Sequence, residues 1–599
     1  MRGMAQADFS TVFWQLGLIL LAATIMNFFA RKAKQPPLVG YIFGGIIIGP
    51  YFISFISSSF GLTTSFFPKL DISNVALLSQ LGVAFLLFSV GVESNLFKLK
   101  NLGTVIIVSG FVQVLLTVAI TMLLGLAISG LSFSESLYLG VILSCSSTML
   151  ILKLLSDSFS INTIHGRLML GISLVQDAAI VLMMPLLLKI GFALDGQIIF
   201  DVFVFGATLL FLAIALNRFI YPAVFKRLSG NTEVLFLAPI SVCFAFMFIS
   251  ETFGMPMAIG AFIAGVSLSA LPYSAEVANE IRGLRDFFVT IFFVTLGMQL
   301  NIFSLPAATA VIVLAIIVIF LLKPFITYWI TMLAGYGNDI AASVAFCLIP
   351  VSEYSFLLAS QGHSAGALTG DFHSTVIFVI GLSMIVTPYI FKYRRTIEST
   401  LQKMPWNRQK FSVFFSRNLE SVFEEKELSS KVIIAGGGIM GGSLARFLKS
   451  ENPIVLDHDP DVISLLKKEG ISAVYGEIDN EHLWRKIKIK DTKVVIIAVP
   501  SFDSAVKLLK YAKKENPAMV VFARAHSFAE AKELYAENAD FVCLPEAAAS
   551  NIVVKEVMEY LHSGSLTRIR ALHSEMMMHI EEAAAKHPKK KTSKKDGLI

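Results

Sequence analysis

One apolar segment reads Leu168-Met-Leu-Gly-Ile-Ser-Leu-Val-Gln-Asp-Ala-Ala-Ile-Val-Leu-Met-Met-Pro-Leu-Leu-Leu188 and holds an adjacent glutamine and aspartate, Gln176 and Asp177. A run of about twenty such residues can cross roughly 30 Å of hydrocarbon as a helix. A carboxylate at that depth is costly and is a functional candidate unless it lies at a helix end. Because no Lys or Arg lies within one turn of Asp177, we expect another helix, a bound cation or a proton to balance its charge.

A single buried carboxylate is the chemical minimum for ion exchange, because it must always hold either a proton or a cation. Gln176 places a neutral carbonyl and amide beside Asp177. The alternative is structural, with a protonated Asp177 joining two helices by hydrogen bonds. The pattern favours the first interpretation, in which Asp177 is the site of the transported cation.

The composition of the chain is that of a membrane protein with a soluble part. Of 599 residues, 55% are hydrophobic and 15% are charged, whereas about a quarter of an ordinary soluble protein is charged. The mean hydropathy is +0.71. After Lys392 charges return, and hydrophobic runs shorten to the length of buried strands. We predict a membrane domain at residues 1–395, a linker at 396–429, a soluble domain at 430–560 and a helical and basic tail at 561–599.

Hydropathy and turn signals predict about thirteen membrane spans. They cover residues 9–29, 37–57, 73–93, 103–129, 135–155, 166–190, 196–222, 232–252, 254–270, 286–301, 306–332, 339–360 and 372–391. Alternate loops collect the Lys and Arg residues on one face, which the positive-inside rule makes cytoplasmic. An odd number of spans then predicts an outside N-terminus and a cytosolic C-terminal domain. The first span is too long for a signal peptide, and we expect a multi-pass protein of a bacterial inner membrane.

Other charged side chains occur in or near these spans. Lys323 lies deep in an apolar run before Pro324, which disrupts the helix ladder, so Lys323 is the natural partner of a buried carboxylate. Glu353 adds polarity to the following span. Glu93 lies near a span end, where an interfacial position explains it as well as any functional role.

Three small hydroxyl side chains follow one another in the fifth span, at Ser146, Ser147 and Thr148. They can satisfy the backbone of an unwound stretch, line a cation site, or simply pack helices. The four cysteines are scattered, with no CxxC pair and no nearby His cluster, so neither a disulfide framework nor a zinc site is indicated.

The soluble part begins with a strand–turn–helix pattern. The run Val432–Ala435 precedes a glycine-rich turn, Gly436-x-Gly438-x-x-Gly441, and a second strand, Ile454–Asp457, ends in an acid. The glycines let a phosphate approach a helix N-terminus, and Asp457 can take ribose hydroxyls. A carboxylate there argues against a 2′-phosphate and favours NAD(H) or an adenine nucleotide over NADP. Further strands are expected at 473–475, 494–499, 520–523 and 541–544.

Motifs in a fixed order extend over nearly the whole membrane part. They are Pro37-Leu-Val-Gly-Tyr-Ile-Phe-Gly-Gly-Ile-Ile-Ile-Gly-Pro50, Gly91-Val-Glu93, Ser146-Ser-Thr148, Gly166-Arg167, Gln176-Asp177, Gly260-Ala-Phe-Ile-Ala-Gly265, Phe292-Phe-Val-Thr-Leu-Gly-Met298, Lys323 and Ser352-Glu-Tyr-Ser-Phe356. Together they resemble the monovalent cation:proton antiporter-2 family, and within it the Kef-type potassium/proton antiporters.

The resemblance implies a polytopic α-helical protein with an inverted-repeat cation/proton antiporter fold, separate dimerisation and core bundles, and an elevator-like movement of the core. Asp177 would bind cation and proton alternately. The Gln-Asp pair resembles the potassium-linked branch, which implies one cation per proton provided that Lys323 does not also titrate. The implied ion-binding set is Asp177, Gln176, Ser146, Ser147, Thr148, Lys323 and Glu353.

The soluble part resembles the regulator-of-potassium-conductance (RCK, TrkA-N) domain of Kef-type proteins. The resemblance lies in the stretches Val455–Asp461, Gly476–Asp479 and Phe522–Ala525. The resemblance implies a Rossmann-like, dimeric sensor in which AMP or NAD(H) gates the membrane part. Gly476-Glu-Ile-Asp departs from the commoner Gly-Asp-Ala form. The expected nucleotide-binding residues are Gly436, Gly438, Ile439, Met440, Gly441, Asp457, His458, Asp459, Glu477, Asp479 and Arg524. Arg524 also matches a basic residue of the region through which glutathione adducts act in Kef-type relatives.

The sequence therefore predicts a transporter and not an enzyme: a nucleotide-regulated exchanger of K⁺ for H⁺. A Na⁺/H⁺ antiporter of the same fold is the first alternative. A potassium channel with the same sensor would need a Thr-Val-Gly-Tyr-Gly filter, which the chain lacks. A membrane-tethered oxidoreductase would need a substrate domain after the Rossmann unit. The expected partners are a second copy of the chain, membrane lipids and an ancillary regulatory subunit, with no nucleic acid.

Overall fold

The structure is a computed structural model. It describes residues 9–33, 35–60, 72–93, 103–127, 131–190, 196–222, 224, 232–253, 255–269, 271, 274–402, 429–476, 478, 483–484, 487, 489–563 and 570. The chain divides into two compact units, Met1–Leu419 and Glu420–Ile599.

The first unit is built from helices. They are α1 (Phe9–Lys32), α2 (Pro37–Ile48), α3 (Pro50–Phe60), α4 (Ile72–Glu93), α6 (Thr104–Ala127), α7 (Phe133–Ser144), α8 (Thr148–Asp157), α9 (Ile164–Ile190), α10 (Gly196–Phe219), α12 (Thr232–Thr252), α13 (Met257–Ser269), α14 (Ser274–Gln299), α15 (Thr309–Ile317), α16 (Lys323–Leu333), α17 (Asn338–Cys347), α18 (Glu353–Ser364) and α19 (Gly370–Gln402). A π-helical turn at Val318–Leu322 joins α15 to α16.

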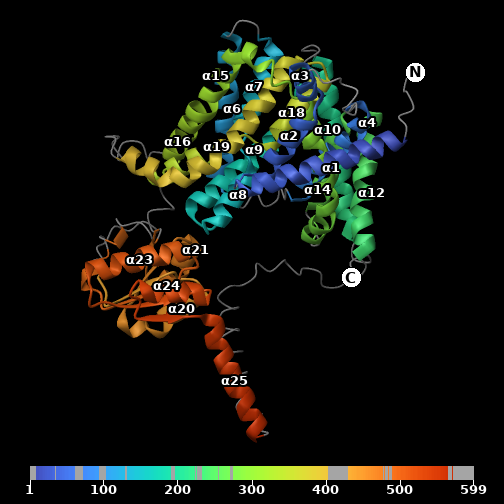
Figure 1. The fold of residues 1–599 in the computed structure, drawn as a ribbon. Coiled ribbons are helices and arrows are strands. Elements are labelled where there is room, and N and C mark those ends of the chain that lie inside the picture. The colour runs from blue at the N-terminus through green and yellow to red at the C-terminus, as the bar shows by residue number, and fades with distance from the viewer. Residues whose placement is uncertain are drawn as a thin grey trace. The chain divides into compact units, whose positions relative to one another are not determined.

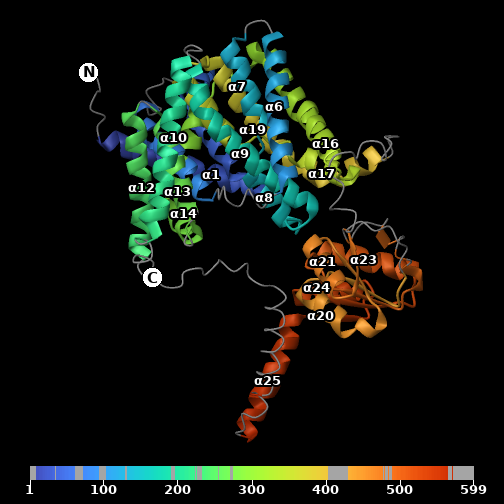
Figure 2. The ribbon, with the colours of Figure 1, turned by 180° about the vertical axis from the view of Figure 1, so that it is seen from behind.

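These helices form two bundles that lie side by side (Figures 1 and 2). The scaffold bundle consists of α1, α2, α4, α12, α13 and α14, and the crossing bundle of α6 to α9 and α15 to α19. Helix α10 contacts α9 in the crossing bundle and α13 in the scaffold bundle. The predicted separation of the membrane part into two helical bundles is thus visible in the helix contacts.

Glycines allow the scaffold helices to touch through their backbones. A Cβ on Gly45 of α2 would lie 2.0 Å from the carbonyl oxygen of Val294 in α14, and one on Gly297 would lie 2.2 Å from that of Ile42. Since no side-chain carbon fits at such distances, only glycine is compatible with this contact.

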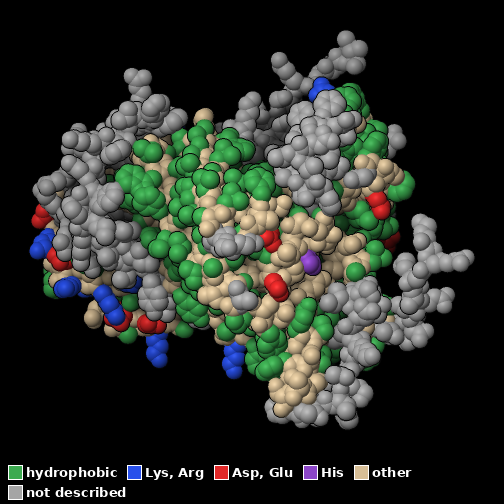
Figure 3. Space-filling model, turned by 90° about the horizontal axis from the view of Figure 1, so that it is seen from above, with side chains coloured by type: hydrophobic (Ala, Val, Ile, Leu, Met, Phe, Trp, Pro, Cys, Tyr) green, Lys and Arg blue, Asp and Glu red, His purple; other side chains and the backbone are tan. Residues whose placement is uncertain are grey.

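The surface of this unit matches a lipid environment. Within the described residues, five helices are long and apolar enough to cross a membrane, and the bent pair of α2 and α3 would make a sixth. Large apolar side chains are exposed, for example Phe28, Leu115, Phe211, Phe248 and Leu321. Hydrophobic side chains accordingly cover large parts of the surface seen from above (Figure 3). Water would disfavour so much exposed apolar area, whereas lipid accommodates it.

Several predicted spans differ from the structure in detail. The spans at 135–155 and 339–360 are each two half-helices, because the chain is extended between α7 and α8 and again between α17 and α18. The span at 286–301 is part of a helix that begins at Ser274, since its first turns carry charges that hydropathy excludes. Helix α19 continues to Gln402, into the segment predicted as linker.

The second unit contains a six-stranded parallel sheet in the order β3-β2-β1-β4-β5-β6. Its elements are β1 (Val432–Ala435), α20 (Ile439–Phe447), β2 (Ile454–Asp457), α21 (Pro460–Lys468), β3 (Ser472–Tyr475), β4 (Val494–Ile497), α23 (Phe502–Glu515), β5 (Val520–Arg524), α24 (Phe528–Ala536), β6 (Phe541–Cys543) and α25 (Pro545–Ser563). The predicted alternation of strands and helices is confirmed, as is each predicted strand to within two residues.

Both faces of this sheet are buried by helices. Alternate residues of β1 point to opposite sides: Val432 and Ile434 pack in one apolar cluster with Ala445 of α20, and Ile433 and Ala435 in another with residues of α23. This is why the strands read as continuous apolar runs rather than as an alternating pattern. In Figure 1, α25 projects away from the sheet.

Candidate functional site

The candidate ion site lies where two broken helices of the crossing bundle meet. Ser146 pairs with Val351 in an isolated antiparallel bridge. On either side of this bridge, Ser147 N donates to Pro350 O at 3.1 Å and Ser352 N donates to Cys145 O at 3.2 Å. Backbone groups away from water must be satisfied within the protein. The two extended segments meet this requirement by bonding to each other.

Two hydroxyl side chains start the second half-helices. Ser147 Oγ accepts from Leu150 N at 3.3 Å and caps α8, and Ser352 Oγ accepts from Tyr354 N at 3.2 Å and caps α18. Serine at these positions compensates N–H groups that the helix itself leaves unpaired. The sequence Ser-Ser-Thr therefore supplies the helix restart predicted as one role of these hydroxyls.

Asp177 of α9 is buried and faces these helix starts. Its Oδ2 accepts from Thr148 Oγ1 at 2.6 Å, and its Oδ1 lies 3.4 Å from Ser352 Oγ, a long contact. The N-termini of α8 and α18 carry partial positive charge, which favours a carboxylate at this place. Neutral hydroxyls and helix ends thus hold Asp177, and no described Lys or Arg side chain forms an ion pair with it.

Glu353, the first residue of α18, is a second buried carboxyl at the crossing. Its Oε2 accepts from Ser147 Oγ at 2.7 Å. Its Oε1 is buried and has no hydrogen-bond partner among the described residues. A buried acceptor without a donor is unusual, and at this position it is available to a cation or a proton.

Lys323 is fully buried, and its position differs from the expectation. Its Nζ donates to the backbone carbonyl of Cys145 at 2.8 Å, and no ion pair to a carboxylate is formed in the part of the chain that the structure describes. Cys145 follows the C-terminal end of α7, where unpaired carbonyls concentrate negative charge. The predicted partner of Lys323 was a carboxylate, and the actual partner is this helix end.

A π-helical turn precedes Lys323. The N–H of Lys323 donates to Val318 O, five residues earlier, next to Pro324, which has no N–H to give. The disturbance of the helix ladder that the proline predicted is therefore present. Turns of this kind occur often at functional sites.

Gln176 does not reach into the site but anchors it. Its Oε1 accepts from Ser146 N at 2.9 Å, and its Nε2 donates to Oε1 of Gln113 in α6. Ser146 Oγ donates to Leu348 O at 2.7 Å and is likewise occupied. Gln113 was not predicted from the sequence. The signal that could have found it was an amide side chain in a helix that otherwise carries apolar residues and small hydroxyls.

The candidate nucleotide site lies at the carboxyl end of the sheet, where β1 and β4 are neighbours and the strand order reverses. Gly436 has φ +97°, a left-handed conformation, and a Cβ on Gly441 would lie 1.8 Å from Gly436 O. Gly438 precedes α20 and has no atom within 4 Å of where a Cβ would be. The turn is thus closely packed at Gly441 and open at Gly438, as a phosphate-binding turn requires.

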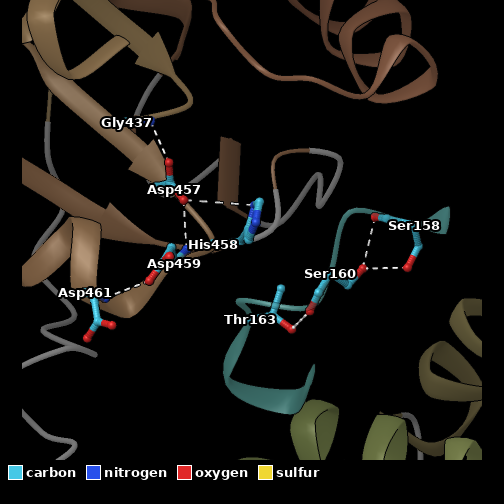
Figure 4. A network of polar contacts seen from close by, with 8 residues as sticks. All are labelled: Ser158, Ser160, Thr163, Gly437, Asp457, His458, Asp459 and Asp461. Carbon is cyan, nitrogen blue, oxygen red and sulfur yellow. Dashed lines mark hydrogen bonds and ion pairs between the residues drawn. The ribbon is translucent and has the colours of Figure 1, made fainter. Parts of the chain in front are cut away.

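Asp457 at the end of β2 holds this turn (Figure 4). Its Oδ2 accepts from Gly437 N at 2.6 Å and its Oδ1 from Asp459 N at 2.8 Å. His458 Nδ1 lies 4.0 Å from Oδ1 of the same carboxylate. Asp459 in turn caps α21 by accepting from Asp461 N at 2.9 Å. Asp457 therefore has a structural role beside the predicted one toward ribose.

The remaining predicted residues of this site are spread around the same edge. Ile439 and Met440 form the first turn of α20, and Ile439 is 96% exposed. Arg524 ends β5, and its buried Nε has no hydrogen-bond partner among the described residues. Glu477 and Asp479 lie outside the described residues, as do the side chain of Glu93 and the basic tail. The chain thus places a glycine turn, a carboxylate and a guanidinium at one sheet edge.

Comparisons with known proteins agree with both units. The family described as sodium/hydrogen exchanger, transmembrane, matches residues 17–393, and the TrkA-N domain matches residues 432–545. The Escherichia coli (strain K12) protein YbaL, which is named as a cation/proton antiporter, is 26% identical over 92% of this chain and 97% of its own. The K(+) efflux antiporter 6 of Arabidopsis thaliana is 28% identical over 63% of this chain and 62% of its own.

A solved structure supports the fold of the membrane part. The sodium proton antiporter MjNhaP1 from Methanocaldococcus jannaschii matches with a TM-score of 0.50 and 15% identity, over 65% of this chain and 98% of that one. The membrane match covers more than half of the chain. The chain therefore belongs to the sodium/hydrogen exchanger family, as a Kef-type cation/proton antiporter whose membrane-embedded part is followed by a soluble TrkA-N domain.

Proposed function

We propose that the chain exchanges K⁺ for H⁺ one for one, as a potassium efflux system coupled to proton entry, with Asp177 as the group that binds either ion and the TrkA-N domain as a nucleotide-controlled gate. The observation that carries the proposal is the composition of the buried cluster at the helix crossing. Among the described residues, the acidic and basic side chains of this cluster are Asp177, Glu353 and Lys323, and each of them is buried.

The charge of this cluster sets the exchange ratio. With both carboxyls ionised and the ammonium charged, the cluster carries one net negative charge. Such a charge away from water requires compensation. One monovalent cation or one proton brings the cluster to neutrality, and the two therefore compete for one place. Gln176 cannot titrate and adds no further charge.

Potassium is the preferred cation in this proposal because of the Gln-Asp pair and because one relative, 28% identical, is named as a K⁺ efflux antiporter. Hydroxyls at Ser147, Thr148 and Ser352 can bind either K⁺ or Na⁺. A sodium/proton antiporter is therefore the competing function, and ion substitution separates the two.

Alternating access would come from movement of the crossing bundle against the scaffold bundle. The ion site is built wholly from the crossing bundle, by α7, α8, α9, α16, α17 and α18, so it could move as one body while its contacts stay intact. An elevator-like movement uses such an arrangement. The positive loops support an outside N-terminus and a cytosolic C-terminus in a bacterial inner membrane.

The nucleotide in this proposal is AMP or NAD(H). The open space at Gly438, the uncapped start of α20 and the carboxylate of Asp457 fit a phosphate and a ribose at one sheet edge. Arg524, with its unpaired Nε, would meet a negatively charged group there.

We further propose that the protein works as a homodimer in contact with membrane lipids, together with an ancillary regulatory subunit. Exposed apolar residues along α25, among them Val553, Val554, Val557 and Leu561, support a second copy as a partner of the soluble unit. A helix with such a surface is poorly suited to water alone.

The test is ion-driven proton flux into proteoliposomes that contain the full chain and a pH-sensitive dye. K⁺, Na⁺ or Rb⁺ is added to the wild type, to Asp177→Asn and to Asp157→Asn, which makes the same chemical change at the exposed end of α8. We expect a K⁺-driven signal that is lost only in Asp177→Asn. Equal flux in all three proteins would refute the role of Asp177, and a signal with Na⁺ alone would make the protein a sodium exchanger.

A further inference from the structure

Two buried amides form a hydrogen-bonded chain behind the ion site. It starts at Ser146 N, which donates to Gln176 Oε1 at 2.9 Å, and continues from Gln176 Nε2 to Gln113 Oε1. Gln113 Nε2 then donates to Ser144 O and to Thr117 Oγ1, each at 3.1 Å. Both glutamines are at most 1% exposed. This hydrogen-bonded chain therefore starts in the extended segment after α7 and ends on the carbonyl of Ser144, the last residue of α7.

The two backbone ends fix the direction of every bond in this chain. A backbone N–H can only donate, and a backbone carbonyl can only accept. Reversing either amide would place donor against donor or acceptor against acceptor at one end. The side chain at position 176 must consequently accept at one atom and donate at the other, which an amide does and an ionised carboxylate cannot.

We propose that Gln113 is a positioning residue that makes an amide the required neighbour of Asp177, and so keeps Asp177 the single acid of the pair. Gln113 touches neither Asp177 nor the candidate cation position through any described hydrogen bond. It acts through Gln176. The inference rests on the proposed exchange at Asp177 and explains why that exchange carries one charge.

The same geometry defines the side chains that can replace the two amides. If position 176 holds a carboxylate, position 113 must offer donors to three acceptors: that carboxylate, Ser144 O and Thr117 Oγ1. A lysine ammonium has three donors and no acceptor, and its charge would cancel that of the new carboxylate. The double change Gln113→Lys with Gln176→Glu is therefore expected to rebuild the chain, whereas each single change leaves it broken and adds an unpaired buried charge.

The experiment measures K⁺-driven proton flux of the full chain in proteoliposomes, with the amount of monodisperse protein fixed by size-exclusion chromatography. The variants are Gln113→Lys, Gln176→Glu, the double variant and Gln113→Leu. The matched control is Thr121→Val, about two turns further along α6 than Gln113, because Thr121 Oγ1 is buried and has no described hydrogen-bond partner. Asp177→Asn supplies the background.

Gln113→Leu removes all three hydrogen bonds of the Gln113 side chain. We expect it to lower the flux about tenfold or more, since a tenfold change corresponds to about one buried hydrogen bond. Each charged single variant should fall to background, Thr121→Val should match the wild type, and the double variant should regain flux well above either single one. A purely structural role for Gln113 would make the double variant worse than the singles. A monodisperse double variant at background overturns the proposal.

A single variant also tests the proposal if the double variant does not fold. Gln176→Glu or Gln113→Leu with wild-type flux overturns it by itself. If instead Asp177→Asn keeps wild-type flux, the proposed function has failed. If Asp177→Asn loses its flux while the Gln113 variants keep theirs, only the inference about Gln113 has failed.

Discussion

The glycine turn of the soluble unit allows a pair of substitutions with opposite expected effects. In Gly441→Ala, the new Cβ would lie 1.8 Å from Gly436 O, so the turn must move by more than about 1 Å to reach an ordinary contact. Forcing a group into a packed position costs about 1–3 kcal/mol. For a unit of the size of Glu420–Ile599, this lowers the melting temperature by about 2–12 °C.

Gly438→Ala should leave the domain nearly as stable as before. No atom lies within 4 Å of the new Cβ, and φ of −63° suits alanine. Losing a preferred helix-capping residue lowers the free energy of unfolding, whereas the stiffer unfolded chain raises it. The two effects partly cancel, and we expect a net change within about 1 kcal/mol. The new methyl group would nevertheless occupy the space proposed for a phosphate, and we expect the affinity for AMP or NADH to fall at least about tenfold.

The assay is thermal unfolding of the full-length protein, with and without AMP or NADH. A ligand at about 100 times its dissociation constant stabilises the folded state by about 2.7 kcal/mol, which identifies the transition of the soluble unit. Gly441→Ala should lower that transition without ligand, and Gly438→Ala should abolish only its shift with ligand. Unchanged melting in Gly441→Ala, or an unchanged ligand shift in Gly438→Ala, would refute the reasoning.

Three further predictions concern single residues. Glu353→Gln removes the negative charge that a bound cation would neutralise, so the half-saturating K⁺ concentration in the flux assay should rise at least about tenfold. Glu353→Asp keeps the charge and should raise this concentration less. The same half-saturating concentration in Glu353→Gln and the wild type would contradict the charge balance. Phe159 has φ +54° and is 53% exposed, so Phe159→Asn should raise stability by about 0.5–1 kcal/mol and Phe159→Val should lower it; a lower melting temperature for the Asn variant would speak against strain. Burial by itself would raise the pKa of the Asp540 carboxyl, but the hydrogen bond and charge of Lys513 and the N–H of Val521 lower it overall. A depressed pKa stabilises the folded state above the ordinary pKa of 3.8 and less as the pH falls below it. Asp540→Asn should therefore cost up to about 1 kcal/mol at pH 7 and less in acid, and an equal loss of stability at both pH values would exclude this linkage.

The soluble unit was predicted closely because its signals are local. Apolar runs of four or five residues, glycines at fixed spacing and an acid at a strand end follow directly from backbone geometry within about 30 residues. The contact of Asp457 with Gly437 N was not foreseen, since the same carboxylate can serve a ribose or a backbone amide. Only the folded turn shows that it already bonds to the backbone.

In the membrane unit, the sequence by itself predicted that Asp177 lies inside an apolar helix, and the structure confirms that it is buried. The cost of a carboxylate at such a position makes Asp177 a candidate for function. It also predicted that Lys323 lies deep in a span, which the burial of Lys323 confirms. Only the tertiary structure decided what each contacts: Lys323 bonds to a carbonyl 178 residues away, and Ser147 to Glu353 206 residues away. These partners depend on where two broken helices cross, and the periodicity of one helix contains no information about the backbone of another.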